Sequence, residues 1–325
     1  MFAKGKKPFF AVVAAALCCG VFAKPEAVDF RIRDPYVLVD GGRYYLYESK
    51  PWSGGDGVYV RRGMDLATWT AKEPAMILPP DVRATAVWAP EVHRFGGKYW
   101  MFVTITENKG VREMAPPGKG AKKQNVVPRG TWVFSSGSPT GPFKPVKKGP
   151  VPPQEQQTLD GTLYVEDGKP YMVYCHEWCQ TGNGTIDYAP LAPDFASFLE
   201  EPKTLLDAKS AMEGAGAVTD GPFFHRSEKS GRLYLIWSNF VAGRGYCIFV
   251  RSSASGKIAG PWTKDEILFG RDGGHGMVFK GIDGVLRLTF HQPNASPRER
   301  MKVFRLSDDG ERLSLAPSPG AISAL

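Results

Sequence analysis

Runs of alternating apolar and polar residues occur in pairs, and the pair recurs five times along the chain. Each copy opens on a polar stretch, continues as a β-rich run, turns at a glycine and returns as a run rich in aromatic residues. Such alternation with a period of two, broken by a short glycine turn, is typical of two antiparallel strands. The copies are residues 34–49, 89–104, 160–175, 220–238 and 274–291.

Each copy is followed by further strand-like segments. Each segment consists of a strand-like run followed by a turn rich in Gly, Pro, Ser or Asp. The last residue is aromatic in four of the five segments and is Leu315 in the fifth. They are residues 57–69, 130–143, 185–198, 246–262 and 301–315. The pattern therefore predicts about four antiparallel strands per copy. The one helix-like stretch that we expect is near residues 194–213.

The spacing of the copies predicts the fold. Taking one polar opener per copy gives Asp34, Glu91, Asp160, Asp220 and His275, which are 57, 69, 60 and 55 residues apart. A period near 60 with four strands per repeat indicates an all-β, five-bladed β-propeller. A propeller brings equivalent positions together around one axis. Three aspartates would then converge on one cavity, which is costly unless they serve a function.

The same topology predicts which side chains surround that cavity. If the opener starts the innermost strand, the second strand of each blade ends on the same face of the ring. The residues expected at this rim are Glu48, Thr106, Glu107, His176 to Trp178, Asn239 and His291. Trp52 and Trp88 also lie close to rim positions. Tryptophans here would stack on a sugar or fill the core.

Composition sets the broad class. The chain has 325 residues, of which 42% are hydrophobic and 23% charged, as in soluble globular proteins. Lys4, Lys6 and Lys7 precede an apolar run from Phe9 to Val21, and Val21-Phe22-Ala23 fits a cleavage site. We therefore predict a signal peptide at residues 1–23, a single propeller domain at 24–325, and export to the periplasm or medium with no membrane anchor.

Charge and cysteines exclude several other classes. Removal of residues 1–23 leaves 38 basic and 33 acidic residues, a net charge of +5. The basic residues are scattered except in the Gly- and Pro-rich loop 109–129, which we interpret as a solvated insertion and not as a nucleic-acid site. Cys175 and Cys179 would lie about 13 Å apart in a strand, too far for a disulfide. These two cysteines are therefore expected to be buried thiols, and with Cys247 the odd count of three also argues against a disulfide framework.

Five short motifs carry a specific resemblance. IRDPYV with Asp34, Trp88-Ala89-Pro90-Glu91, Leu159-Asp160-Gly161, Thr219-Asp220-Gly221-Pro222 and Gly274-His275-Gly276 together resemble glycoside hydrolase family 43. That family is a five-bladed propeller acting on arabinose-, xylose- or galactose-containing glycans. The resemblance covers residues 31–310. HEWCQ at 176–180, GGHGM at 273–277 and HQPN at 291–294 look like an exo-acting bacterial branch.

The resemblance implies an inverting mechanism with two carboxyl groups, one as base and one as acid. Asp34 then takes the place of the general base, and Asp160 that of the aspartate that orients the acid and raises its pKa. Asp220 takes the place of the acid, within Asp-Gly-Pro where the family has Glu-Gly-Pro. Three alternatives stay open: Asp220 is the acid, Glu177 replaces it, or the protein only binds sugars. Glu213 is a weaker substitute.

The expected activity is that of an exported exo-glycosidase acting on terminal arabinofuranosyl or galactofuranosyl-type residues. A β-xylosidase and a non-catalytic carbohydrate-binding propeller are the alternatives. Expected sugar contacts are Trp52, Trp88, Glu91, Glu177, Trp178 and His291. His275 is either a hydrogen-bonded core residue or lies near a structural calcium or sodium ion, and the chemistry requires no cofactor. The expected partner is an oligo- or polysaccharide, bound by a monomer.

Overall fold

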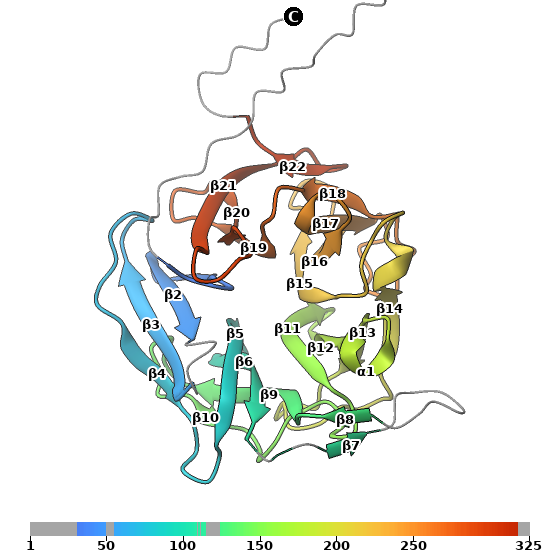
Figure 1. Ribbon diagram of the computed structural model, residues 1–325. Helices are drawn as coiled ribbons and strands as arrows, with labels where there is room; N and C mark the ends of the chain where they lie inside the picture. The colour runs from blue at the N-terminus through green and yellow to red at the C-terminus, as the bar shows by residue number, and fades with distance from the viewer. Residues whose placement is uncertain (1–30, 50–54, 109, 111, 115–123, 318–325) are drawn as a thin grey trace, which may run out of the picture.

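The chain forms a ring of five sheets around a central axis (Figure 1). This computed structural model describes residues 31–49, 55–108, 110, 112–114 and 124–317. Each of the five sheets has four antiparallel strands, so the predicted five-bladed β-propeller is confirmed. The predicted signal peptide and Trp52 lie outside the described residues. No helix in the described part of the chain has the length and apolar character needed to cross a bilayer.

The strands follow one another around the ring in sequence order, apart from a small hairpin in the second blade. The first two blades are β1 (Tyr36–Asp40), β2 (Arg43–Ser49), β3 (Gly57–Gly63) and β4 (Glu73–Ile77), then β5 (Ala84–Phe95), β6 (Lys98–Glu107), β9 (Arg129–Ser136) and β10 (Lys144–Pro145). The third and fourth are β11 (Thr158–Glu166), β12 (Lys169–His176), β13 (Thr185–Pro190) and β14 (Lys203–Asp207), then β15 (Asp220–Arg226), β16 (Leu233–Val241), β17 (Gly245–Ser253) and β18 (Glu266–Phe269). The fifth is β19 (Gly274–Lys280), β20 (Leu286–Gln292), β21 (Arg300–Asp308) and β22 (Leu313–Leu315).

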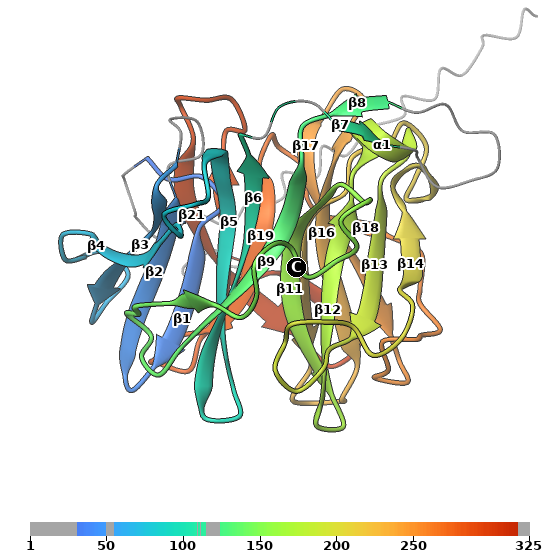
Figure 2. The ribbon, with the colours of Figure 1, turned by 90° about the horizontal axis from the view of Figure 1, so that it is seen from below.

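Short elements outside the blades differ from the prediction. The stretch 194–213 holds β14 and a 3-10 turn, η1 (Ala208–Ser210), while an α-helical turn, α1 (Trp178–Thr181), follows β12. Loop 109–129 contains the hairpin β7 (Arg112–Met114) and β8 (Gln124–Val126). Figure 2 shows α1, β7 and β8 at one end of the ring. Helix propensity in 194–213 is therefore overridden by pairing of β14 with β13.

The start of each innermost strand has an unusual backbone. β5, β11, β15 and β19 each contain a register shift near their beginning, between Trp88 and Glu91 in the first case. One residue at each shift, and one just before β1, has a positive φ of 45–56°. These residues are Asp34, Ala89, Asp160, Gly221 and His275. The alignment of the five repeats taken from the sequence is thus correct at Asp34, Asp160 and His275. In the fourth blade the equivalent residue is Gly221, one residue after Asp220, and in the second blade it is Ala89, two residues before Glu91.

Apolar side chains between neighbouring sheets form the core. The largest fully buried ones include Trp132, Trp237, Tyr47 and Tyr174, which accounts for much of the aromatic content. The ring closes without a shared strand, because β19 to β22 are consecutive in sequence. Residues before β1 bridge the first and last blades instead. The Arg31 side chain pairs with Glu299 at 3.0 Å, and Arg33 donates to the Asn294 carbonyl at 2.9 Å.

Candidate active site

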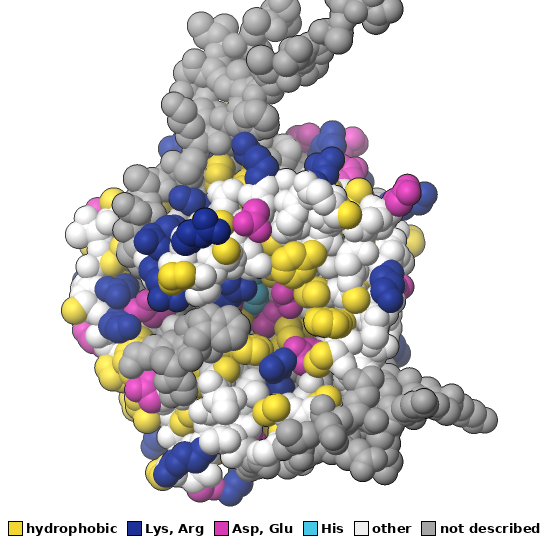
Figure 3. All heavy atoms as spheres, viewed as in Figure 1, with side chains coloured by type: hydrophobic (Ala, Val, Ile, Leu, Met, Phe, Trp, Pro, Cys, Tyr) yellow, Lys and Arg dark blue, Asp and Glu magenta, His cyan; other side chains and the backbone are white. Residues whose placement is uncertain are grey.

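A cavity of about 290 Å³ opens at the centre of one face of the ring. Figure 3 shows this hollow with acidic and histidine side chains at its floor. Seven residues that the sequence nominated line it: Asp34, Trp88, Asp160, Glu177, Trp178, Asp220 and His275. They come from all five blades: Asp34 lies just before β1, four lie on β5, β11, β15 and β19, and Glu177 and Trp178 follow β12. The expected convergence of carboxylates on the axis is therefore observed.

Asp34 is held by two histidines and an arginine. Its Oδ1 lies 3.1 Å from Nδ1 of His291 and 3.4 Å from Nδ1 of His275, and its Oδ2 is 4.0 Å from Nε of Arg33. Burial by itself raises the pKa of Asp34, but the charge of His275, the hydrogen bond from His291 and the charge of Arg33 outweigh it and lower that pKa. Asp34 is thus kept as a carboxylate.

The surroundings of Asp160 shift its pKa in the opposite direction from that of Asp34. Its Oδ2 accepts a hydrogen bond from the Gly221 amide at 3.0 Å and lies 3.7 Å from Nδ1 of His275. Burial and then the neighbouring charge of Asp34 raise its pKa well above the usual range. The imidazole of His275 therefore lies between two aspartates whose pKa values move in opposite directions, the pattern found where acid and base roles are divided.

Asp220 reaches the cavity from the residue before its bulge. The hydroxyl of Tyr246 donates to its Oδ2 at 2.9 Å. Burial and the charge of Asp160 raise the pKa of Asp220 to about 7, against the lowering effects of His275 and Tyr246. A carboxyl group with this pKa is protonated over part of the neutral range and can donate a proton.

Glu177 is bound in an ion pair. It comes between β12 and α1, and its Oε1 contacts the guanidinium of Arg129. Its Oε2 lies 3.0 Å from the Cys179 thiol. The same guanidinium packs 4.3 Å from the centre of the Trp88 ring. The indole, the guanidinium and the carboxylate thus form one connected wall of the cavity.

Two nominated sugar contacts lie away from the cavity wall. Glu91 is buried, with its Oε2 2.9 Å from Nε2 of His93, because it follows the bulge position by two residues. His291 is fully buried behind Asp34, and its Nε2 lies 3.0 Å from Oδ1 of Asn294. These placements give Glu91 a structural contact and His291 a positioning role toward Asp34, in place of the direct sugar contacts that we predicted.

Several cavity residues escaped the sequence analysis. Arg129 was counted with a solvated basic loop, yet its side chain is 19% exposed and lines the cavity. Tyr246 and Phe240 lie on strands whose aromatic residues otherwise fill the core. Asn294 belongs to the HQPN segment, so that motif was a usable signal; for Arg129 the signal was its place at the start of β9.

The cysteines and the possible ion complete the description. Cys175 is a buried free thiol as predicted, and Cys247 is buried as well. The prediction for Cys179 was wrong, because Cys179 lies in the α1 turn after β12 and is partly exposed. Calcium usually takes six to eight oxygen ligands. Within the described residues no group of three or more His, Cys, Asp or Glu side chains is arranged to hold a metal ion. The charged partners of His275 are the carboxyl groups of Asp34 and Asp160, and these side chains do not by themselves form a calcium site.

Comparison with known proteins identifies the family. The model for glycosyl hydrolases family 43 matches residues 27–307. An extracellular exo-α-(1→5)-L-arabinofuranosidase of Streptomyces chartreusis is 26% identical over 243 residues, which is 70% of this chain and 66% of that protein. An α-L-arabinofuranosidase 43 of Humicola insolens is 23% identical, covering 79% of this chain. The chain spans 66% and 53% of the lengths of these two relatives.

A solved structure agrees with this result. The endo-arabinase from Bacteroides thetaiotaomicron is 33% identical, with a TM-score of 0.74, and the match covers 87% of this chain and 97% of that one. The motifs at Asp34, Asp160 and Asp220, the five blades and the match over nearly the whole propeller lead to one conclusion. This chain belongs to glycoside hydrolase family 43 and is a glycosidase of the arabinofuranosidase-like type.

Proposed function

We propose that this chain is an exported, inverting exo-glycosidase that releases terminal arabinofuranosyl or galactofuranosyl-type residues from polysaccharides. The observation that carries the proposal is the opposite direction of the pKa shifts in one cavity, lowered for Asp34 and raised to about 7 for Asp220. The names of the relatives, an exo-arabinofuranosidase and an arabinase, support arabinose as the first sugar to test.

In the proposed reaction Asp34 removes a proton from a water molecule, and the water oxygen forms a bond to the anomeric carbon from the opposite side of the ring. The bond from that carbon to the glycosidic oxygen breaks, and Asp220 transfers its proton to the departing oxygen. Asp34 ends protonated and Asp220 ionised, so a proton exchange with solvent restores both. Burial and then the neighbouring Asp160 carboxyl raise the pKa of Asp220 and so favour the protonated form that the reaction needs.

The choice of Asp220 over Glu177 as the acid rests on their partners. Both carboxylate oxygens of Glu177 already have protein partners, the Arg129 guanidinium at Oε1 and the Cys179 thiol at Oε2. Asp220 accepts one hydrogen bond from Tyr246 and has the Asp160 charge nearby. The bulge at Gly221 places Asp220 at a different point of the blade from Asp34 and Asp160. That difference supports an acid that is one methylene shorter than the family's glutamate.

Exo action is supported by the shape of the site. The cavity volume of about 290 Å³ is small for a ligand pocket, where roughly 300–1,000 Å³ is usual. Trp178 and Phe240, 47% and 40% exposed, stand at its walls as apolar surfaces for a sugar ring. One relative's name says exo and the other's says endo, so product analysis has to decide.

The test combines substrates and stereochemistry. Activity is measured on 4-nitrophenyl α-L-arabinofuranoside, β-D-galactofuranoside and β-D-xyloside, and proton NMR follows the first-formed anomer. We expect turnover of a furanoside with inverted configuration, and only monosaccharide released from arabinan. Preference for the xyloside would favour the β-xylosidase, and a product of retained configuration would overturn the mechanism. Sugar binding without turnover would indicate a binding propeller. An N-terminus at Lys24 in exported protein would support cleavage after Ala23.

A further inference from the structure

A line of hydrogen bonds runs behind the proposed base, through a side chain that takes no part in the proposed reaction. Asn294 lies in the turn between β20 and β21. Its backbone oxygen accepts from Nη1 of Arg33 at 2.9 Å, and its side-chain Oδ1 accepts from Nη2 at 2.8 Å. The same Oδ1 lies 3.0 Å from Nε2 of His291, whose Nδ1 lies 3.1 Å from Oδ1 of Asp34. Asn294 thus connects an arginine to the histidine that holds the base.

The guanidinium of Arg33 fixes the orientation of the Asn294 amide. An arginine side chain offers only donors, so the atom that faces its Nη2 is the amide oxygen and not the NH2 group. A carbonyl oxygen cannot donate a hydrogen bond. The Nε2 atom of His291 that faces the same oxygen must therefore carry a hydrogen. This conclusion holds for both the neutral and the charged imidazole.

The hydrogen on Nε2 decides what Nδ1 of His291 can do. A neutral imidazole carries one hydrogen, so its Nδ1 is then only an acceptor. In that form Nδ1 accepts from the backbone N–H of Asp34, 3.3 Å away, and donates nothing to the carboxylate. Only the imidazolium has a hydrogen on Nδ1 to donate to Oδ1 of Asp34. His291 therefore bonds to the amide of Asp34 when it is neutral and to the carboxylate when it is charged.

The groups around the His291 ring make Asp34 its ionic partner. The ring is fully buried, and the ring of Tyr246 from β17 stacks on it with the two centroids 5.8 Å apart. The Tyr246 hydroxyl already donates to a carboxylate of the cavity. The positive charge of Arg33 is separated from the imidazole by the Asn294 amide. His275 from β19 contacts the same Asp34 oxygen, at 3.4 Å.

We propose that Asn294 is a positioning residue that keeps a hydrogen on Nε2 of His291, so that His291 donates to the Asp34 carboxylate only as an imidazolium. The inference rests on the proposed function, because it takes Asp34 as the base. A carboxylate that accepts a hydrogen bond from a cation is a weaker base than one without it. The charge of His291 then sets how readily Asp34 takes a proton from water, and Asn294 excludes the neutral form that would also donate.

The first measurement detects the hydrogens on the imidazole nitrogens and needs no substrate. Protein labelled with ¹⁵N in histidine is followed by NMR from about pH 5 to about pH 8. In the wild type, Nε2 of His291 should stay protonated throughout, and any proton lost should leave Nδ1. Asn294→Leu has a similar size and no acceptor, so its Nε2 should lose the hydrogen as pH rises. Asn294→Asp keeps an oxygen there and should keep the wild-type pattern. His225, paired with Asp308, reports whether each variant is folded.

Two outcomes of the NMR measurement would overturn the proposal. One is a wild-type His291 with a bare Nε2 and a hydrogen on Nδ1. The other is an Asn294→Leu protein whose Nε2 keeps its hydrogen at the highest pH, because Asn294 would then not be what holds it. Gln292→Ala is the matched control. It removes a carboxamide from the same segment, but one that bonds to the Arg271 carbonyl, and the His291 signals should not change.

The second measurement separates positioning from a direct contact with the sugar, because Asn294 also lines the cavity. On an aryl furanoside, Asn294→Leu should lower kcat about tenfold, the effect of one lost hydrogen bond, and change KM less than about twofold. Asn294→Asp should restore most of that loss. A raised KM with an unchanged kcat would make Asn294 a sugar contact and overturn the positioning role. No turnover by the wild type would contradict the proposed function alone, since the NMR measurement does not depend on activity.

Discussion

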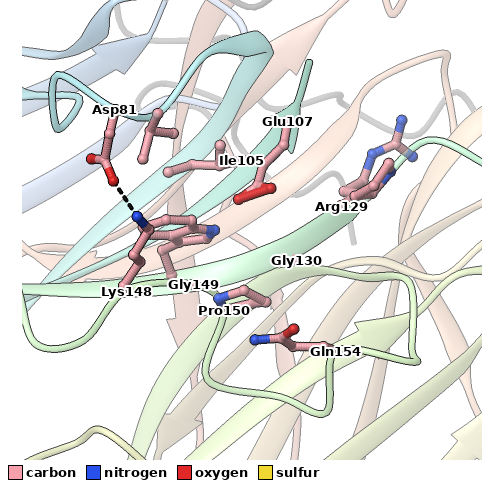
Figure 4. Close-up of a pocket in the computed structure, with 12 residues that line it drawn as sticks. Asp81, Ile105, Glu107, Arg129, Gly130, Lys148, Gly149, Pro150 and Gln154 are labelled. Atoms are coloured by element: carbon pink, nitrogen blue, oxygen red, sulfur yellow. Dashed lines mark hydrogen bonds and ion pairs between the residues drawn. The ribbon is translucent and has the colours of Figure 1, made fainter. Parts of the chain in front are cut away.

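The cavity around Asp34 and a neighbouring pocket of about 320 Å³, called here the rim pocket and lined by Asp81, Glu107, Arg129 and Lys148 among others (Figure 4), share Arg129 and differ in their charges. In the cavity, Asp34, Asp160 and Asp220 are crowded around His275, and the first two have pKa values displaced in opposite directions. In the rim pocket the acidic side chains have basic neighbours, and its non-glycine residues have ordinary negative φ. The two neighbouring pockets have similar volumes. They differ in their charged side chains, which are crowded aspartates in the cavity and a mixture of acidic and basic residues in the rim pocket.

The difference indicates where this fold stores unfavourable energy. Asp34, Asp160 and His275 are held at φ of 50–56°, at a cost on the order of 1–3 kcal/mol each for residues other than glycine. Burying like charges side by side adds to that cost. Neither cost, positive φ at residues other than glycine or like charges buried side by side, is found in the rim pocket. We infer that the cavity is arranged for proton transfer, and each prediction below tests that inference.

The largest effect is expected for Asp34→Asn. Asparagine has the same shape but cannot accept a proton from water, so kcat should fall by about 10²- to 10⁴-fold. The fold should persist, as judged by circular dichroism. Asp167→Asn, at an exposed hairpin turn far from the site, is the matched control and should keep full activity. If Asp34→Asn keeps more than about a tenth of the rate, Asp34 is not the base and the contrast between the pockets loses its main support.

The next effect distinguishes the acid. Asp220→Ala and Glu177→Ala are compared on an aryl arabinofuranoside and on arabinobiose. Loss of the acid should slow the disaccharide by about 10²-fold or more and the aryl substrate much less, because a phenolate leaves without a proton. We expect this dependence for Asp220→Ala. Glu177→Ala should slow both substrates alike, since it removes the partner of Arg129. The reverse result would move the acid to Glu177.

A smaller effect concerns pH. Activity needs Asp34 ionised and Asp220 protonated, so kcat/KM should fall as pH rises through about 7, the pKa of Asp220. The same raised pKa affects stability. Its contribution is fully present below the ordinary value of 3.8 and is lost as pH rises through about 7. The melting temperature of Asp220→Asn relative to wild type should therefore increase between pH 4 and pH 8. A constant difference across that range would contradict the assignment.

The smallest effect is expected from metal removal. The proposed proton transfers use carboxyl groups only, so dialysis against EDTA should leave kcat on the aryl substrate within about twofold of the untreated enzyme. A thermal melt of the same sample reports any structural ion. Abolished turnover that returns with added calcium would mean that an ion near His275 positions the reacting groups.

The sequence predicts the ring well and its inner surface less well. Strand alternation and the period near 60 suffice for five blades, because both depend on local patterning. The bulges do not follow from that pattern. Because of the bulges, Glu91 and Asp220 do not occupy the position in their blades that Asp34 occupies in the first blade. This difference is seen only in the observed strand register. Arg129 was missed for another reason: its partner Glu177 lies 48 residues away, and no periodicity connects the two.

The contacts that close the ring between the first and last blades lie next to the proposed active site, so their stability should affect activity. The first and last blades are joined here by side chains, notably Arg31 with Glu299 and Arg33 with Asn294. Asp34 follows Arg33 directly, and Oδ1 of Asn294 contacts both Arg33 and His291, which supports the Asp34 carboxylate. The side chains that close the ring and the proposed base, Asp34, are therefore neighbours in the chain. Heat or urea that loosens these contacts should inactivate the enzyme before the blades themselves unfold.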